Sequence, residues 1–350
     1  MKNLYITGSA GTSKTTMAVG LAQKLQQIGY RVSYFKPIGA ITATGGSIDE
    51  DALLMKQLLQ IDKPIETIVP CSTSPFYLTR FHQSTELEAK ISEAYQEINK
   101  DADIVLIDGA IFPHAMASMN FDVPTLAKKF NAALLQMVKI KNDYSLDQAM
   151  FFNRFFDCQG IQVVGNVFYN VPRQILAKTE GVYKEILEEN GFKTLGIVPR
   201  CAELNAPTVE HLYQVLGGEL LTGADQLMRL VEDSIVGAMT IESALNYLRR
   251  SANKAVITGG DRADMALAAL ETDTSVIILT GGLYPDVKVI AKAKEKGVPV
   301  ILVHYDTFAT IERMSEVSHR IKADDERSIK LALENVERYI DWQAILDELK

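Results

Sequence analysis

Residues 4–16 read LYITGSAGTSKTT, and this stretch decides the fold of the first half of the chain. A short apolar run leads into a loop of small residues and then into Lys-Thr-Thr. After the loop, Met17, Leu21, Leu25 and Ile28 recur at helical spacing. The pattern predicts a strand, a phosphate-binding loop and a helix, because backbone N–H groups and a helix N-terminus then face one anion.

The loop residues have expected roles in holding a nucleotide. Glycine lets the backbone approach the phosphates, Lys14 supplies charge to the outer phosphates, and the Thr15 hydroxyl reaches Mg²⁺. The alternative is a small-residue turn with a solvent-facing lysine, since Ser13 stands where the usual pattern has glycine. Thr15-Thr16 after the lysine favour phosphate binding. The expected nucleotide-binding residues of the loop are Gly8, Ser9, Ala10, Gly11, Thr12, Ser13, Lys14, Thr15 and Thr16.

Composition limits the class of protein. The chain has 350 residues, 47% hydrophobic residues and a formal net charge of −8, which is typical of a soluble globular protein and argues against nucleic-acid binding. Its three cysteines are scattered, as expected in the reducing cytoplasm. No signal peptide or membrane span is expected, because the first residues already form a strand and no apolar run is long enough.

Four charged residues of the first domain lie at the end of an expected strand or at the start of an expected helix. Lys36 ends the strand 31–37, and a lysine at that edge meets phosphate or an acidic substrate, or else precedes Pro37 as a surface residue. Asp49 and Asp51 start a helix, where they either cap it or hold Mg²⁺ opposite Thr15. Asp108 ends the strand 103–108 and either sits beside the metal, orienting a water, or is a turn residue.

Strands and helices alternate through the first 200 residues. Further strands are expected at 132–138, 161–168 and 194–198, with helices between them. Such alternation predicts an α/β fold with a parallel sheet covered on both faces. The glycine-rich segment 217–223 is the expected hinge to a second domain.

The second half of the sequence contains a short internal repeat. A strand runs into Thr-Gly-Gly at 258–260 and again at 280–282. The turns either offer N–H groups to an anion or let backbones pack closely, and Arg262 either clamps phosphate or pairs with Asp261. The candidate second anion site comprises Thr258, Gly259, Gly260, Asp261, Arg262, Thr280, Gly281 and Gly282. The tail 324–350 is helical, with Ile329, Leu333, Val336 and Ile340 on one packing stripe.

Two family resemblances follow from these motifs. About the first 210 residues resemble the dethiobiotin synthetase-type P-loop domain. The resemblance rests on six segments in this order: 7–14, Phe-Lys-Pro-Ile-Gly at 35–39, Asp51-Ala52, Asp108-Gly109, Gly165-Asn166-Val167 and Gly-Ile-Val-Pro at 196–199. More closely, these residues are similar to the copy at the N-terminus of long phosphate acetyltransferases. Asp261-Arg262 and the later Thr280-Gly281-Gly282 resemble the DRTGG domain, which follows that P-loop domain in the same enzymes.

The resemblance implies a domain plan and a set of ligands. It implies a P-loop domain over 1–212, a smaller α/β DRTGG domain over 213–322 and a helical tail over 323–350. It implies ATP and Mg²⁺ as cofactors, with Thr15, Asp51 and Asp108 on the metal. Asn166 and Pro199 join the nucleotide-binding set, and Lys14, Lys36 and Asp108 are the expected catalytic residues.

Two functions of different class remain open at this point. The sequence ends before the acyltransferase domain of the long enzymes, so that activity is not expected. The first function is a stand-alone nucleotide-sensing regulatory protein, homo-oligomeric and paired with an enzyme of acetate metabolism. The second is an ATP-dependent ligase of the dethiobiotin synthetase or cobyrinic acid a,c-diamide synthase group. The altered segment after Asp108, where dethiobiotin synthetases carry a Glu-Gly-rich run, favours regulation.

Overall fold

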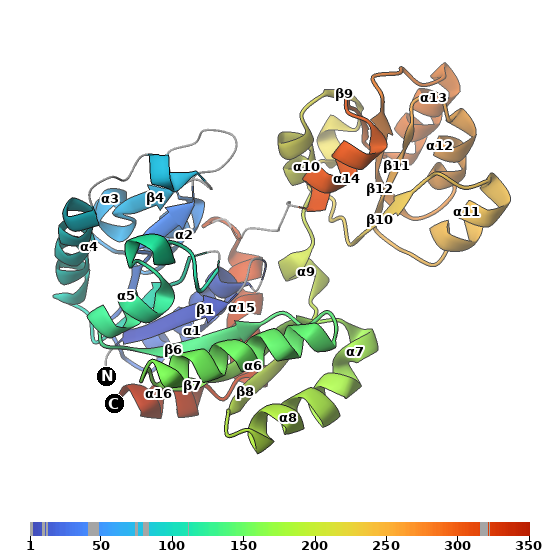
Figure 1. Cartoon of the computed structure of the whole chain (residues 1–350). Helices are drawn as coiled ribbons and strands as arrows, with labels where there is room; N and C mark the ends of the chain where they lie inside the picture. Colours follow the sequence, from blue (N-terminus) through green and yellow to red (C-terminus); the bar gives the residue numbers. More distant parts are fainter. Residues whose placement is uncertain are drawn as a thin grey trace. The chain divides into compact units, whose positions relative to one another are not determined.

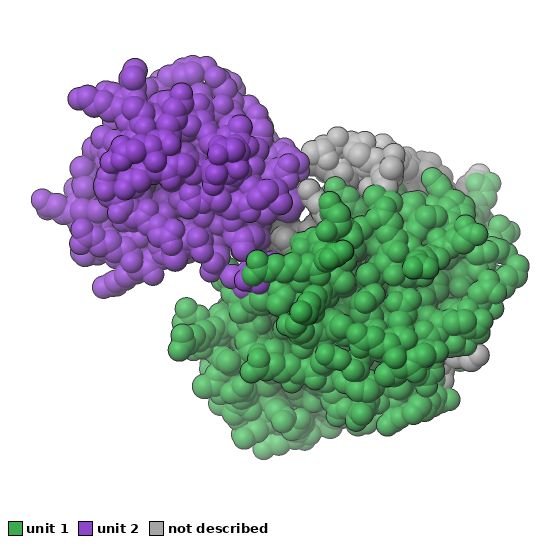
Figure 2. All heavy atoms as spheres, turned by 180° about the vertical axis from the view of Figure 1, so that it is seen from behind, with its two compact units in different colours: residues 1–201, 321–350 green, residues 202–320 purple. Residues whose placement is uncertain are grey.

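The computed structural model describes residues 3–8, 11, 13–40, 49–73, 76–79, 84–110, 112–315, 321 and 323–350. The chain divides into two compact units (Figure 2). Unit 1 comprises residues 1–201 together with 321–350, and unit 2 comprises residues 202–320. The chain therefore leaves unit 1, builds unit 2 and returns to unit 1.

The opening stretch forms the central strand of unit 1. In the described part of this unit, six strands form one sheet in the order β2-β5-β1-β6-β7-β8, with every pair parallel. The strands are β1 (Asn3–Gly8), β2 (Val32–Phe35), β5 (Ile104–Asp108), β6 (Ala132–Val138), β7 (Val163–Val171) and β8 (Thr194–Pro199). A separate parallel pair, β3 (Ile38–Ala40) and β4 (Cys71–Thr73), follows β2. The predicted α/β class with a parallel sheet is confirmed.

Helices connect these strands and cover the sheet (Figure 1). Asp49, Asp122 and Asn142 each cap a helix by accepting a hydrogen bond from a backbone N–H group in its first turn. The helices of the first 201 residues are α1 (Lys14–Gln27), α2 (Glu50–Leu58), α3 (Ile65–Ile68), α4 (Ser84–Asn99), α5 (Val123–Lys129), α6 (Asp143–Cys158), α7 (Arg173–Lys178) and α8 (Lys184–Glu189).

The C-terminal segment completes unit 1. Helix α15 (Glu326–Tyr339) packs on α1 and β8, and α16 (Trp342–Leu349) packs on β8. Successive residues of β7 show that the sheet is covered on both faces, since Phe168 packs in the core with α6 whereas Tyr169 hydrogen-bonds to Asn335 of α15. Ile340 bridges Gly196, so the outer edge of β8 is covered.

Unit 2 is a smaller α/β sandwich. Its described strands form a sheet in the order β10-β11-β12-β13-β9, which is parallel except for β9 against β13. The strands are β9 (Glu219–Thr222), β10 (Asp233–Val236), β11 (Lys254–Gly259), β12 (Thr274–Thr280) and β13 (Val300–Leu302). The helices are α9 (Ala202–Asn205), α10 (Val209–Leu216), α11 (Ile241–Leu248), α12 (Ala263–Leu270), α13 (Val287–Lys296) and α14 (Thr307–Ser315).

The predicted hinge at 217–223 is wrong, because this segment contains the edge strand β9 of unit 2. Gly218 and Gly223 flank the strand with positive φ values of 87° and 81°. A Cβ on Gly218 would lie 2.2 Å from the Leu302 carbonyl oxygen. The glycines therefore serve close strand packing, and not a flexible connection.

No helix in the described ranges has both the length and the apolar character needed to cross a membrane.

The contact between α1 and α15 depends on Gly20, and we expect Gly20→Ala to destabilise unit 1. A Cβ at this position would lie 2.3 Å from the Ala332 carbonyl oxygen, and backbone atoms cannot move aside cheaply. Overpacking costs about 1–3 kcal/mol, which exceeds the gain of about 1 kcal/mol in helix propensity. Thermal unfolding should show a melting temperature lowered by roughly 2–8 °C.

Gly181→Ala is the matched control for this experiment. Gly181 has nothing within 4 Å of an added Cβ, so this variant should melt at or above the wild-type temperature. Equal melting temperatures for Gly20→Ala and wild type would show that α15 does not hold this position on α1.

Candidate functional site

The carboxyl ends of the unit 1 strands bring charged side chains to one edge of the sheet. Lys14 opens α1 directly after the loop that follows β1, Lys36 follows β2, and Asp108 ends β5. Because β1 pairs with β5 and β5 pairs with β2, these three residues come from neighbouring strands. Ligands of open parallel sheets bind at this edge.

Ser13 has the left-handed backbone conformation that the usual glycine at this position of a phosphate loop would adopt. Its φ is 56° and its ψ is 39°, a conformation that glycine adopts most easily. The serine therefore takes up a glycine-type backbone, and Lys14 and Thr15 begin the helix as expected. Gly11 also has a positive φ of 68°. Ser9, Ala10 and Thr12 lie outside the described residues.

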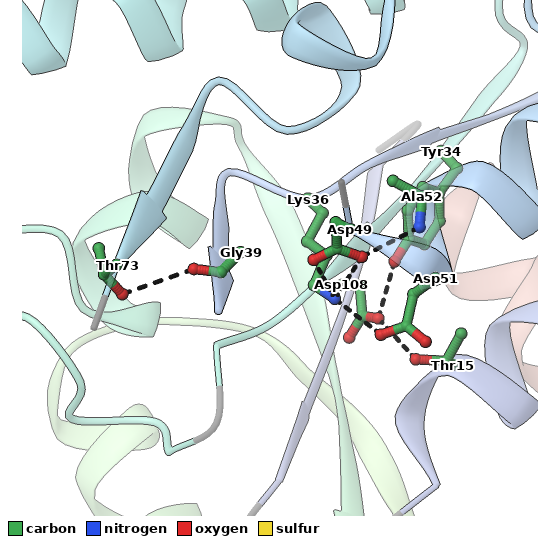
Figure 3. A network of polar contacts seen from close by, with 9 residues as sticks. All are labelled: Thr15, Tyr34, Lys36, Gly39, Asp49, Asp51, Ala52, Thr73 and Asp108. Atoms are coloured by element: carbon green, nitrogen blue, oxygen red, sulfur yellow. Dashed lines mark hydrogen bonds and ion pairs between the residues drawn. The ribbon is translucent and has the colours of Figure 1, made fainter. Parts of the chain in front are cut away.

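Asp108 is the centre of a buried hydrogen-bond network (Figure 3). It is 2% exposed, and its Oδ2 accepts hydrogen bonds from the Thr15 hydroxyl at 3.1 Å and the Tyr34 hydroxyl at 2.8 Å. Thr15 belongs to the first turn of α1, so the carboxylate links the phosphate-loop helix to β2. Asp108 is therefore buried and hydrogen-bonded, and does not face solvent as an exposed turn residue would; its role at a metal stays a prediction.

The Lys36 side chain is buried, and its amine is held by the carboxylates of Asp49 and Asp51. It is 9% exposed, and its Nζ lies 2.9 Å from Asp49 Oδ2 and 2.7 Å from Asp51 Oδ2 (Figure 3). Asp49 also accepts from the Ala52 N–H at 3.1 Å and so caps α2. Burial alone would lower the pKa of Lys36, but Asp51, Asp108 and Asp49 outweigh burial and raise it, so the side chain stays charged.

The pKa values of Lys14 and Asp108 are both shifted in the direction that disfavours the charged form. Burial lowers the pKa of Lys14, although the nearby Asp108 opposes the shift. Burial likewise raises the pKa of Asp108, although Lys36 and Lys14 oppose it. Cations and carboxylates that are desolvated together in this way are typical of functional sites.

The residues of this edge fit a magnesium ion that is shared with a nucleotide. Asp108 Oδ1 is buried and accepts no hydrogen bond from the described residues, so one carboxylate oxygen is left for a ligand. Asp51 and the Thr15 hydroxyl lie beside it (Figure 3). Within the described ranges, no cluster of at least three His, Cys, Asp or Glu side chains is built as a metal site. Mg²⁺ is ordinarily completed by phosphate oxygens and waters, which fits so small a protein set.

Asn166 is not brought to this edge. It lies inside β7, 0% exposed, where its amide bonds to Asn153 at 2.8 Å and to the Lys193 carbonyl at 3.2 Å. The asparagine near the end of the strand is Asn170, which lies one residue before Val171 and has a φ of 58° and a buried Oδ1 without a partner among the described residues. The physical reason is the length of β7, which carries the strand past Asn166 to Val171. Pro199 does lie at the edge, paired with Val171.

The sequence interpretation also missed Lys139, which follows β6 on the other side of β1. A Cβ built on Gly11 would lie 2.8 Å from Lys139 Nζ, so the amine lies against the phosphate loop. Its position one residue beyond an apolar strand was the available signal.

In unit 2 the two Thr-Gly-Gly turns lie at the ends of the neighbouring parallel strands β11 and β12. The N–H groups of Gly260, Gly281 and Gly282 each donate to a backbone carbonyl of the unit. A Cβ on Gly260 would lie 1.7 Å from the Leu283 carbonyl oxygen. Of the two readings of these glycines, close packing is the one that this geometry favours. Arg262 bonds to the Met239 carbonyl at 3.0 Å and to Asp264 at 3.3 Å, and not to Asp261.

Two family models match consecutive parts of the chain. Residues 2–208 match the family model described as AAA domain, and residues 211–317 match the DRTGG domain. The phosphate acetyltransferase of Nitratidesulfovibrio vulgaris is 27% identical over 97% of this chain and 50% of its own length. That of Pseudomonas putida is 24% identical over 95% of this chain and 49% of its own length. The chain spans about half the length of the curated relatives it matches.

Solved structures give partial similarities only. The septum site-determining protein MinD of Pyrococcus horikoshii, complexed with Mg-ADP, is 14% identical, with 58% of this chain and 83% of its own chain covered and a TM-score of 0.35. The CBS and DRTGG domains of Clostridium perfringens pyrophosphatase, complexed with diadenosine tetraphosphate, are 16% identical, with 48% and 86% covered and a TM-score of 0.29.

The ion pairs of Lys36 generate a prediction about metal binding. Lys36→Met removes the buried cation that pairs with the partly buried Asp49 and Asp51, which should lower the free energy of unfolding by at most about 3–5 kcal/mol. A divalent cation that occupies the carboxylates offsets this repulsion. We therefore expect millimolar Mg²⁺ to raise the melting temperature of Lys36→Met more than that of the wild type.

Lys63→Met is the control, because Lys63 also forms an ion pair, with Glu97 at 3.3 Å, but these side chains are more exposed, at 30% and 46%, than the buried Lys36. Its removal should change stability by less than about 1 kcal/mol and leave the Mg²⁺ response unaltered. Identical Mg²⁺ responses of Lys36→Met and wild type would mean that these carboxylates do not hold the metal.

Proposed function

The chain belongs to the AAA domain family, and on that premise we propose that it is an ATP- and Mg²⁺-binding regulatory module of the phosphate acetyltransferase type. The observation that carries the proposal is the Thr15–Asp108 contact beside Lys14 at the start of α1. A lysine, a hydroxyl and a buried carboxylate at the end of a phosphate loop are the groups that bind a magnesium nucleotide.

Each group of the site has a definite part in this proposal. Lys14 and the loop amides bind the outer phosphates, and Thr15, Asp51 and Asp108 hold Mg²⁺, which supplies positive charge to the phosphate oxygens. Lys36 keeps Asp51 charged and in place. Asn170 offers a carboxamide oxygen to the rest of the nucleotide, in the position that the sequence interpretation gave to Asn166.

The regulatory part of the proposal rests on the domain pair. The same P-loop and DRTGG regions occur in the phosphate acetyltransferases that the chain matches along nearly its whole length. We propose that nucleotide binding to unit 1 controls an acyltransferase of acetate metabolism, in the cytoplasm and as a homo-oligomer. For unit 2, the proposed second anion site now depends on Arg262, because the glycine N–H groups are engaged.

A ligase of the dethiobiotin synthetase or cobyrinic acid a,c-diamide synthase group is the second candidate. The observation that favours it is the buried, charged Lys36, since a cation at this edge can meet a carboxyl group that ATP phosphorylates. Phosphate release from ATP that depends on an added carboxylate or carbon dioxide acceptor would support the ligase. Binding of ATP without such turnover would support regulation.

We expect Lys14→Ala to weaken ATP binding in the presence of Mg²⁺ by roughly ten- to a hundredfold. The reason is the loss of a charge-assisted contact that contributes about 1.5–3 kcal/mol. Titration calorimetry on the full chain measures the effect. Lys330→Ala, which removes a lysine on the exposed face of α15, is the control and should bind as wild type does. Equal affinity of Lys14→Ala and wild type would overturn the nucleotide site.

We further expect Asp108→Ala to lose the Mg²⁺ dependence of ATP binding. Removal of the buried carboxylate takes away the metal ligand but leaves Lys14 and the loop amides. The ratio of the ATP affinities with Mg²⁺ and with EDTA should therefore fall toward one, while the affinity in EDTA changes little. A wild-type ratio in Asp108→Ala would show that the carboxylate is structural.

A further inference from the structure

Lys139 is a charged residue of this edge that neither the sequence motifs nor the proposed function uses. It is the first residue after β6, and β6 pairs with β1 from Asn3 to Gly8. The pairing of Gly8 with Met137 brings the end of β6 directly beside the start of the phosphate loop. Lys139 therefore flanks the loop on the side opposite to Asp108, which comes from β5.

The amine lies against the loop backbone at Gly11. A Cβ on Gly11 would meet Lys139 Nζ at 2.8 Å, closer than any other atom there. The φ of 68° favours glycine at position 11, and the flexible amine fills the space that a side chain there would take. Two features of the loop, its conformation and its lack of a side chain, thus make room for the lysine head group.

Lys139 differs from the two other lysines of the site in its electrostatic surroundings. Lys14 lies near Asp108 and Asp51, and Lys36 near Asp49, Asp51 and Asp108. Partial burial lowers the pKa of Lys139, and its charged neighbours Lys141 and Arg200 lower it further. The described part of the chain provides no hydrogen bond or ion pair to the Lys139 amine.

A partly desolvated ammonium without a carboxylate costs stability, and the fold places it where a polyanion is expected. We propose that Lys139 is a second phosphate-binding cation, which contacts the polyphosphate held by the loop from the side of β6. The assignment rests on the proposed nucleotide site and adds a residue to it. The ligand class is a polyphosphate, with or without its nucleoside.

The test compares Lys139→Met with Lys139→Arg in the full chain. We expect Lys139→Met to weaken binding of ATP and of inorganic tripolyphosphate by a similar factor, roughly ten- to a hundredfold, because the lost contact is to phosphate. Lys139→Arg keeps the charge and should stay within about threefold of wild type. Without nucleotide, Lys139→Met should melt at or above the wild-type temperature, since it removes an uncompensated charge.

Lys141→Met is the matched control, because Lys141 is exposed on the same segment and its backbone N–H, not its amine, makes the bond to Ser145. Suppose that Lys14→Ala weakens ATP binding but Lys139→Met binds ATP within twofold of wild type. That result would overturn this assignment and leave the proposed function intact. A lowered melting temperature in nucleotide-free Lys139→Met, with Lys139→Arg equally impaired in binding, would instead make the lysine a structural support of the loop. Failure of the wild type to bind ATP or tripolyphosphate would overturn both proposals.

Discussion

The pairing of β1 between β5 and β6 is the constraint on which unit 1 depends. Parallel strands end at one edge, so the residues that follow β5 and β6 must flank the loop that follows β1. This places Asp108 on one side of the phosphate loop and Lys139 on the other. The site is therefore a product of strand order and needs no unusual local structure beyond the left-handed Ser13 and Gly11.

The same constraint concentrates charges that oppose folding. Lys36 and Asp108 are buried and Lys14 is partly buried, and burial acts on the pKa of each. Their mutual attraction and the hydroxyl groups of Tyr34 and Thr15 offset part of that cost. An arrangement of this kind is typical of a site whose charges are completed by a ligand, since a purely structural core is more stable without them.

Local patterns in the sequence were sufficient for most of the fold. Continuous apolar runs marked β1, β5 and β6, because strands buried on both faces need them. The glycine-rich stretch around β9 was misread as a hinge, since its glycines answer to contacts with Leu302 and Pro299 that are remote in sequence. The position of Asn166 inside β7 was missed for a similar reason, because β7 continues to Val171, which pairs with Pro199 of β8.

The sequence could predict only those residues of the candidate site that lie within a local motif. The loop and Asp108 each stand at the end of a recognisable strand, so the sequence could place them at one edge of the sheet, while their roles stay predictions. The partners of Lys36 and the approach of Lys139 to Gly11 depend on which strands are neighbours, which no local pattern states. The amphipathic tail likewise indicated a packing face, but not that its partner is α1 of the same chain.

That partner gives the connectivity of the chain a physical consequence. Helix α1 begins at the phosphate loop, and α15 packs on it so closely that Gly20 has no room for a side chain. The chain reaches α15 only after it has completed unit 2. The contact therefore joins the helix that begins at the loop after β1 to a segment that follows unit 2 in the sequence, and both helices belong to unit 1.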